Sequence, residues 1–183
     1  KGRTYIFCPN HASYLDIVLS YLALPCYFHM MGKAELLKIP LFRDFFLKMH
    51  IPVNRNSTVS SHRAFLRAAA DIKKGISVVV FPEGTIPESA PQLGRFKNGP
   101  FRLAIESRTA LVPVTFLDNW KILPSTKKGL VGGRPGHSHI VIHEPIETKD
   151  MSENDVSSLR EKVFAIISAE MNRSRGKAKT ESS

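Results

Sequence analysis

Short apolar runs typical of strands alternate with helical patterns along this chain, and this alternation constrains its fold most. Ser57 is placed to cap a helix that Gly75 ends, and the apolar run Ile76 to Phe81 follows at once. A continuous apolar run of this length is typical of a strand buried on both faces of a parallel sheet. We therefore expect an α/β fold, with a mostly parallel central sheet flanked by helices on both faces.

The other expected elements extend this alternation over most of the chain. Further strands are expected at residues 4–8, 26–31, 51–54, 111–117 and 139–143. Further helices are expected at residues 13–24, 41–49 and 98–107, and from residue 152 onward. From Arg173 the chain is rich in Arg, Lys, Ser and Gly. Because 183 residues are few for two domains, we expect one domain over 1–172 and a basic, disordered tail over 173–183.

The first expected strand is followed by a histidine and a carboxylate five positions apart. Pro9 stops the strand, His11 falls in a loop, and Asp16 falls in the first turn of the next helix. Within one regular helix the two side chains would point about 140° apart, so they can meet only across this junction. Asp16 could then accept the Nδ1 proton of His11 and leave Nε2 as a general base. Taken alone, the pair also fits an ordinary loop histidine beside a first-turn acid.

A polar turn follows the buried strand, in the segment Phe81-Pro82-Glu83-Gly84-Thr85. Gly84 permits close approach of the backbone, and free N–H groups in such a turn can hold an anion. In a parallel sheet, chemistry gathers at the carboxyl ends of strands, which is where both polar segments are expected.

Three further segments complete an ordered pattern: Gly-Lys-Ala-Glu-Leu at 32–36 with Ile-Pro-Val-Asn-Arg at 51–55, Phe-Lys-Asn-Gly-Pro-Phe at 96–101, and Leu-Val-Pro-Val at 111–114. With Asn-His-x4-Asp first and Phe-Pro-Glu-Gly-Thr between them, the chain resembles the glycerolipid acyltransferase family. The best-known members of that family are the lysophosphatidate (1-acylglycerol-3-phosphate) acyltransferases. The resemblance covers residues 5–171.

The resemblance implies a catalytic dyad of His11 and Asp16. His11 would deprotonate a hydroxyl of lysophosphatidate, which would attack the thioester carbonyl of acyl-CoA or acyl carrier protein without forming an acyl-enzyme. Glycerol-3-phosphate or another lysolipid is the alternative acceptor. The resemblance implies no cofactor other than the thioester co-substrate, and no metal.

The resemblance also implies substrate-binding positions. Arg55 matches a residue associated with the acceptor phosphate, which a guanidinium suits well. The other implied substrate-binding residues are Lys33, Glu83, Gly84, Thr85 and Lys97. Because a carboxylate repels phosphate, we expect Glu83 to hold a hydroxyl or a basic neighbour.

Three residues are assigned supporting roles. Asn10 is expected to orient the loop, and Pro113 to shape the end of its strand. Ser13 belongs to the common form of the first motif, and we expect it to have a structural or capping role instead of acting as a nucleophile.

The chain departs from the family pattern at two positions. Ile86 and Pro87 follow the Glu-Gly-Thr segment where the family commonly has Arg, often followed by Ser, and Met49 stands where a glycine usually opens the second motif. Either Arg95 or Lys97 replaces the missing phosphate ligand, or the acceptor differs. A catalytically inactive lipid-binding relative is the third hypothesis, and the retained dyad argues against it.

The charge of the chain points to anionic partners, since its formal net charge is +10. We expect no nucleic-acid partner, because the chain carries no nucleic-acid-binding signature. Binding to an anionic membrane surface explains the positive charge just as well as nucleic-acid binding would. We therefore expect a membrane-associated protein at the cytoplasmic face. Residues 37–48 mix large apolar and basic side chains, which suits either an interfacial segment or a core helix with a solvated face.

The sequence has neither a run of about 18 apolar residues, which a transmembrane helix needs, nor a signal peptide. It opens on Lys1 instead of Met, so we expect a fragment trimmed at its N-terminus. Two cysteines, Cys8 and Cys26, are too few for a disulfide framework and are expected to be small buried hydrophobes in a reducing compartment.

A zinc site is the competing hypothesis for three histidines near the end of the chain. His137, His139 and His143 share a parity and would face one side of a continuous strand. Because His137 follows a glycine and no carboxylate or cysteine is placed to help, we expect no metal there.

Overall fold

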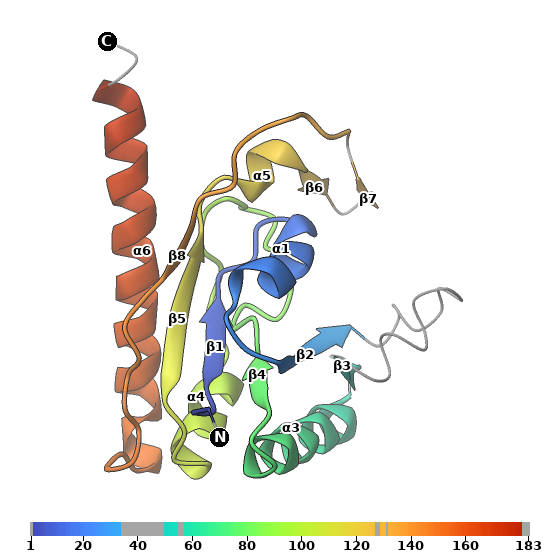
Figure 1. Ribbon diagram of the computed structural model, residues 1–183, viewed down its shortest axis with the longest axis vertical. Coiled ribbons are helices and arrows are strands. Elements are labelled where there is room, and N and C mark those ends of the chain that lie inside the picture. Colours follow the sequence, from blue (N-terminus) through green and yellow to red (C-terminus); the bar gives the residue numbers. More distant parts are fainter. Residues whose placement is uncertain (1, 34–49, 55–56, 127–128, 131, 181–183) are drawn as a thin grey trace.

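The computed structural model describes residues 2–33, 50–54, 57–126, 129–130 and 132–180. Its centre is a six-stranded sheet of order β3-β2-β4-β1-β5-β8, in which only β8 is antiparallel to its neighbour (Figure 1). The strands are β1 Ile6–Pro9, β2 Phe28–Lys33, β3 His50–Val53, β4 Ser77–Val79, β5 Leu111–Phe116 and β8 Ile140–Ile142. The predicted α/β class with a mostly parallel sheet is therefore confirmed.

Helices cover both faces of this sheet. They are α1 Leu15–Ala23, α3 Thr58–Lys73, α4 Gly99–Glu106, α5 Asn119–Ile122 and α6 Val156–Thr180, the last preceded by the 3-10 turn η2 Glu153–Asp155. A two-stranded sheet of β6 Ser125–Thr126 and β7 Gly129–Leu130 lies near α5 (Figure 1). The sequence did not predict α5, β6 or β7, which are short and lack a recognisable period.

The alternation of side chains along β1 divides the core into two layers. Ile6 and Cys8 point to one face and pack with buried residues of α3, α4 and α6. Phe7 points to the other face and packs with Phe28, Val114 and the inner side of α1. Because successive strand residues face opposite sides, β1 needs apolar residues throughout, and all four of its residues are buried.

The position of β1 in the sheet sets the position of the site. β1 lies between β4 and β5 and runs parallel to both, with Ile6 opposite Val78 on one side and Leu111 on the other. The carboxyl ends of these three strands therefore meet at one edge of the sheet.

Several local predictions can be compared with the structure. The Ser57 hydroxyl accepts the N–H of Ser60 and caps α3, and Gly75 follows the helix at φ 83°, a left-handed conformation that favours glycine. Helix α6 continues to Thr180, through residues 173–180, for which the composition had indicated a disordered tail. Once its buried stripe has anchored the helix, polar residues extend it at little cost.

Three other expectations concern the cysteines, residues 41–49 and membrane spans. Cys8 is buried and Cys26 is half-buried, and neither forms a disulfide. The expected helix at 41–49 lies outside the described residues. Within the described ranges, none of the helices combines the length and apolar character that spanning a bilayer requires.

Candidate active site

The loop after β1 is fixed to the end of β5 by Asn10. The side-chain amide of Asn10 donates to the carbonyl of Phe116 (3.1 Å) and accepts the N–H of the same residue (2.8 Å). The Asn10 side chain thus bonds both backbone groups of Phe116, as a further backbone pair between β1 and β5 would. Asn10 therefore sets where the next residue, His11, lies, as its expected supporting role requires.

His11 and Asp16 are in contact across the junction of the loop and α1. The Nδ1 atom of His11 lies 3.0 Å from Oδ2 of Asp16, and both side chains are buried. Because an ionised carboxylate only accepts, Nδ1 carries the proton and Nε2 has the free lone pair. Within the described residues, Nε2 makes no hydrogen bond. The imidazole stacks on the ring of Phe81, with the ring centroids 4.2 Å apart.

Asp16 is completely buried, with 0% of its surface exposed. Its Oδ2 atom accepts the backbone N–H groups of Ala12 (2.7 Å) and Ser13 (2.8 Å) in addition to His11. Its Oδ1 atom accepts the side-chain amide of Asn119 (2.8 Å). Four donors thus compensate for the loss of water around this carboxylate.

Ser13 has the contacts of a structural residue. Its hydroxyl donates to the carbonyl of Leu123 (2.7 Å) and accepts the N–H of Leu15 (3.1 Å) at the start of α1. The hydroxyl thus joins the loop after β1 to the segment that follows α5.

Glu83 follows β4 and has a different partner from the one expected. Its Oε1 accepts the backbone N–H of His11 (2.8 Å), and its Oε2 accepts the backbone N–H of Gly94 (2.7 Å). Burial raises the pKa of Glu83 to about 7, although these two N–H bonds oppose the shift. Among the described residues, the partners of Glu83 are thus backbone N–H groups and not a basic side chain. The buried carboxylate instead joins two loops, because their backbone donors are nearer.

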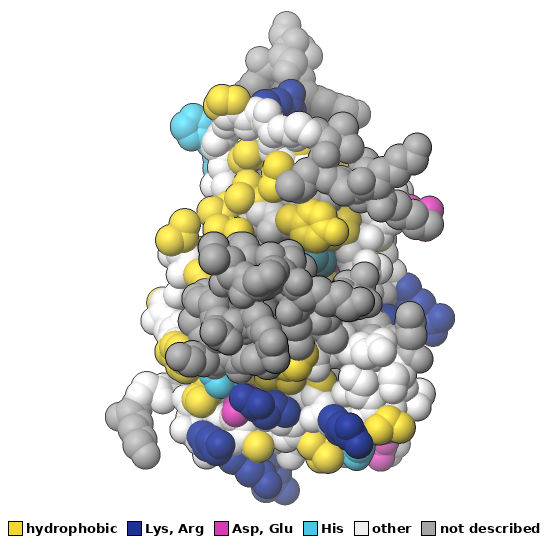
Figure 2. Space-filling view, turned by 90° about the vertical axis from the view of Figure 1, so that its right-hand side faces the viewer, with side chains coloured by type: hydrophobic (Ala, Val, Ile, Leu, Met, Phe, Trp, Pro, Cys, Tyr) yellow, Lys and Arg dark blue, Asp and Glu magenta, His cyan; other side chains and the backbone are white. Residues whose placement is uncertain are grey.

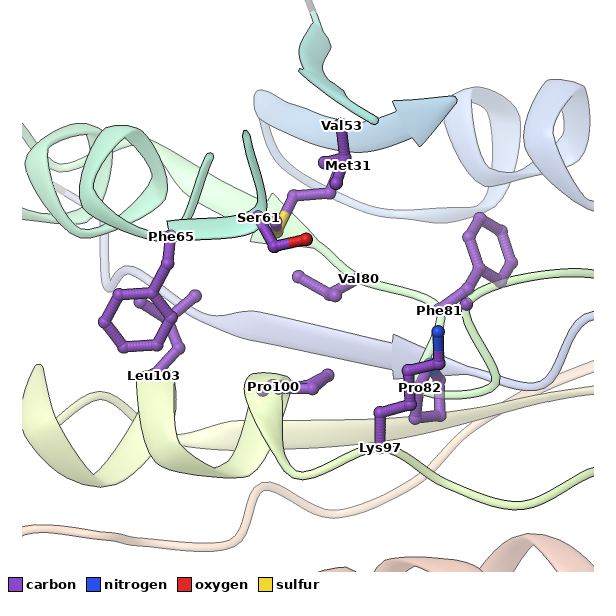
Figure 3. Close-up of a pocket in the computed structure, with 12 residues that line it drawn as sticks. Met31, Val53, Ser61, Phe65, Val80, Phe81, Pro82, Lys97, Pro100 and Leu103 are labelled. Carbon is purple, nitrogen blue, oxygen red and sulfur yellow. The ribbon is translucent and has the colours of Figure 1, made fainter. Parts of the chain in front are cut away.

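Gly84 and Lys97 line an apolar cavity of about 170 Å³ between α3, α4 and the sheet (Figure 3). Gly84 has φ 72°, and a Cβ there would lie 3.0 Å from Nζ of Lys97. Phe81 also lines the cavity while it stacks on His11. The apolar walls come mainly from strand ends and helix faces: Met31, Val53, Phe65, Val80, Pro82, Pro100 and Leu103.

A second hollow adjoins the same turn. It is lined by Glu83, Thr85, Pro87, Gly94, Arg95, Phe96, Lys97 and Asn98. Arg95 and Lys97 are exposed there and give the hollow two cations. Thr85, Gly84 and Lys97 are thus brought together with the loop of His11, through Glu83.

The remaining predicted site residues have different outcomes. Pro113 lies within β5 and is paired with Cys8 of β1, so it belongs to the sheet near the site. Lys33 ends β2, but its side chain lies outside the described part of the structure. Arg55 lies outside the described residues altogether.

Two of the three histidines of the zinc hypothesis have separate partners. Nδ1 of His139 pairs with Asp118 (2.6 Å), while Nε2 of His143 lies 2.8 Å from the hydroxyl of Thr115. Burial lowers the pKa of His143. Across the ranges that the structure describes, His, Cys, Asp and Glu form no group of three arranged to hold a metal ion.

Three residues of this site were not predicted from the sequence. The ring of Phe81 was noted only as part of a strand, and Gly94 and Asn119 not at all. Asn119 follows the carboxyl end of β5, so the rule that placed the other polar residues could have indicated it. Gly94 acts through its backbone N–H, for which the sequence has no signal.

Comparison with known proteins identifies the family. The sequence profile described as Acyltransferase matches residues 1–117. A chloroplastic 1-acyl-sn-glycerol-3-phosphate acyltransferase of Arabidopsis thaliana is 33% identical over 142 residues, which are 77% of this chain and 39% of that protein. A 1-acyl-sn-glycerol-3-phosphate acyltransferase of Chlamydomonas reinhardtii is 29% identical over 171 residues, 92% of this chain and 50% of that protein.

A solved structure agrees with these relatives. The 1-acyl-sn-glycerophosphate (LPA) acyltransferase PlsC from Thermotoga maritima matches 96% of this chain and 68% of its own, with a TM-score of 0.78 and 26% identity. The α/β sheet with polar residues at its carboxyl edge thus has the architecture of an acyltransferase. The chain belongs to the glycerolipid acyltransferase family, as its motifs predicted. It spans about two fifths to a half of the length of these two curated relatives.

Proposed function

We propose that this chain is the catalytic domain of a 1-acyl-sn-glycerol-3-phosphate acyltransferase. It moves a fatty acyl group from an acyl thioester to a hydroxyl of lysophosphatidate. The observation that carries the proposal is the buried hydrogen bond from His11 to Asp16 at the carboxyl edge of the sheet. The names of the relatives and of the similar solved structure support the choice of acceptor.

In the proposed mechanism, His11 acts as the general base. Its Nε2 takes the proton of the acceptor hydroxyl as the oxygen attacks the thioester carbonyl, and Asp16 stabilises the imidazolium that forms. The tetrahedral intermediate then collapses, the carbon–sulfur bond breaks, and the imidazolium returns the proton to the leaving thiolate. General base catalysis of this kind contributes about 10²–10⁴ to the rate.

The surroundings of the turn after β4 suit the two ends of the acceptor. The exposed cations Arg95 and Lys97 supply the positive charge that an acceptor phosphate needs, in place of the arginine that Ile86 replaces. The apolar cavity beside Phe81 suits a fatty acyl chain. Arg55, which lies outside the described residues, is a further proposed phosphate ligand.

The face that presents α1 and α3 supports access from an anionic membrane. Figure 2 shows hydrophobic side chains gathered on the upper part of this face and Lys and Arg side chains on its lower part, at the height of α3. On α1, Leu22 is 79% exposed. Apolar side chains beside basic ones bind anionic bilayers, and each Lys or Arg near the surface contributes about 1 kcal/mol. As part of the proposed function, the domain therefore acts while bound to the cytoplasmic face of a membrane.

An acceptor and donor panel tests the proposal. Thiol release from acyl-CoA and from acyl carrier protein is measured with lysophosphatidate, glycerol-3-phosphate and lysophosphatidylcholine as acceptors. We expect release to require an acceptor and kcat/KM to be at least about tenfold higher for lysophosphatidate. A higher kcat/KM with another acceptor would show that lysophosphatidate is not the preferred acceptor. Lipid binding without thiol release from any pair would favour an inactive relative.

A further inference from the structure

The short helix α5 supplies a side chain to the carboxylate of the proposed dyad. Nδ2 of Asn119 donates to Oδ1 of Asp16 over 2.8 Å, and Asn119 is only 1% exposed. Oδ1 of Asn119 in turn accepts the hydroxyl proton of Ser138 over 2.6 Å. The carboxylate fixes which end of the amide faces it, since it only accepts: the NH₂ group points to Asp16, and Oδ1 is left to accept the Ser138 hydroxyl.

The polypeptide around α5 is attached to the loop of His11 at two further points. Asn10 binds the backbone of Phe116 just before α5, and the hydroxyl of Ser13 donates to the carbonyl of Leu123 just after it. In Figure 1, α5 lies next to α1, the helix that carries Asp16. The bond from Asn119 is therefore made between two segments whose relative position is already set.

We propose that Asn119 is a positioning residue of the active site, which acts on His11 through Asp16. This inference rests on the proposed function. The two oxygens of Asp16 have different partners. Oδ2 accepts from the loop and the imidazole, and Oδ1 accepts only from Asn119 among the described residues. The amide fixes the plane of the carboxylate and therefore the direction in which His11 presents Nε2.

The amide also affects the charge that His11 experiences. A hydrogen bond to Oδ1 stabilises the negative charge of Asp16 and reduces its pull on the imidazole proton. Without that bond, His11 would hold a proton at higher pH, so the acid limb of the kcat/KM profile would move to higher pH. A purely structural role for Asn119 would lower stability without moving this limb.

The test compares three variants with a matched control. Asn119→Leu removes the donor at similar volume, and Ser138→Ala leaves the donor but frees the amide to rotate. Asn119→Asp places a carboxyl against Asp16, where it can donate only while protonated. Thr148→Val is the control, because it removes a buried hydroxyl whose proton is shared between the carbonyls of Ala104 and Thr109, far from the site.

Activity and NMR give independent readouts. We expect Asn119→Leu to lower kcat by about 10–100-fold, the value of one hydrogen bond to a charged group, with KM within about twofold. We expect Asn119→Asp to lose activity increasingly as pH rises, Ser138→Ala to lose about threefold, and Thr148→Val to lose only stability. Because Asp16 then pulls more strongly on the imidazole proton, the Nδ1–H signal of His11 should move to lower field in Asn119→Leu and keep its wild-type position in Thr148→Val.

An unchanged kcat and acid limb in folded Asn119→Leu would overturn the proposal. If that variant does not fold, wild-type values in Ser138→Ala would overturn it as well. The NMR signal separates this inference from the proposed function. If the wild-type protein transfers no acyl group, yet the Nδ1–H signal moves in Asn119→Leu, the proposed function is refuted and the positioning role is retained.

Discussion

Two regions of this molecule contain a buried histidine hydrogen-bonded through Nδ1 to an aspartate. In the first, His11 lies 3.0 Å from Asp16, and in the second, His29 lies 2.8 Å from Asp71. All four side chains are buried, and the local bond is the same. The pairs differ in what surrounds them.

In the second pair, both nitrogens of the imidazole have partners. His29 lies within β2, and its Nε2 is 3.0 Å from the hydroxyl of Tyr27. Asp71 lies on α3 and has a cation nearby, with Nε of Arg67 at 3.5 Å. Both nitrogens of this imidazole are therefore engaged, and the pair links a strand to the helix that covers it.

The first pair lies beyond the end of its strand, where the chain is no longer required to pair. There the imidazole is next to the turn at Gly84 and the apolar cavity, and Nε2 is not engaged by any described residue. The histidine–aspartate bond is the same in both pairs, so it does not by itself single out the proposed catalytic pair. The position of His11 beyond the carboxyl edge of the sheet leaves Nε2 without a partner among the described residues.

The largest expected difference comes from matched histidine substitutions. In both His11→Asn and His29→Asn, the new amide can still donate to the aspartate. We expect His11→Asn to lower kcat by about 10⁴-fold, because the general base is lost, and His29→Asn to keep kcat within about threefold. Steady-state thiol release measures both, and similar losses in the two variants would remove the distinction between the pairs.

The next difference comes from the carboxylates. Asp16→Asn should lower kcat by about 10³-fold, since an amide no longer fixes the tautomer or stabilises the imidazolium. Asp71→Asn should leave kcat nearly unchanged and lower only the midpoint of thermal unfolding. Wild-type turnover in Asp16→Asn would contradict the dyad, with circular dichroism as the check on folding.

Glu83, which binds the backbone N–H of His11 in the first pair, makes the free energy of unfolding depend on pH. Its pKa is raised by burial to about 7 from 4.5, so the folded protein holds this proton more tightly than the unfolded chain. The stability contribution of this group is therefore full below pH 4.5 and is lost as pH rises through 7. Relative to Glu83→Gln, the wild type should lose about 3 kcal/mol of unfolding free energy over this window. The measurement is urea unfolding of both proteins at pH 4.5 and 7.5. A difference in unfolding free energy between wild type and Glu83→Gln that is the same at both pH values would contradict the prediction.

The smallest expected effect concerns the cations. Lys97→Met should raise the KM for lysophosphatidate by about tenfold with little change in kcat, since it removes a charge-assisted contact to the acceptor phosphate. Lys73→Met, which changes an exposed lysine in the last turn of α3, is the matched control and should change neither constant. An acceptor KM unaffected by Lys97→Met would exclude Lys97 as a phosphate ligand.

Much of the fold and part of the site follow from the sequence. The apolar run before Phe81 and the capped helix from Ser57 are local signals, and they predicted the α/β class correctly. The spacing of His11 and Asp16 predicted the contact that the structure has, because only six residues separate the strand end from the helix turn. The partner of Glu83 could not be predicted, since Gly94 reaches it with a backbone N–H.

The sequence by itself determined the strands of the central sheet, most of the helices and the family, because these depend on neighbouring residues and ordered motifs. Only the tertiary structure decided which of two histidine–aspartate pairs has an available nitrogen, and that Asn119, more than a hundred positions away, binds Asp16. Parallel strands explain both outcomes, since they bring residues from distant parts of the chain to one edge of the sheet, and no local pattern encodes which of them meet.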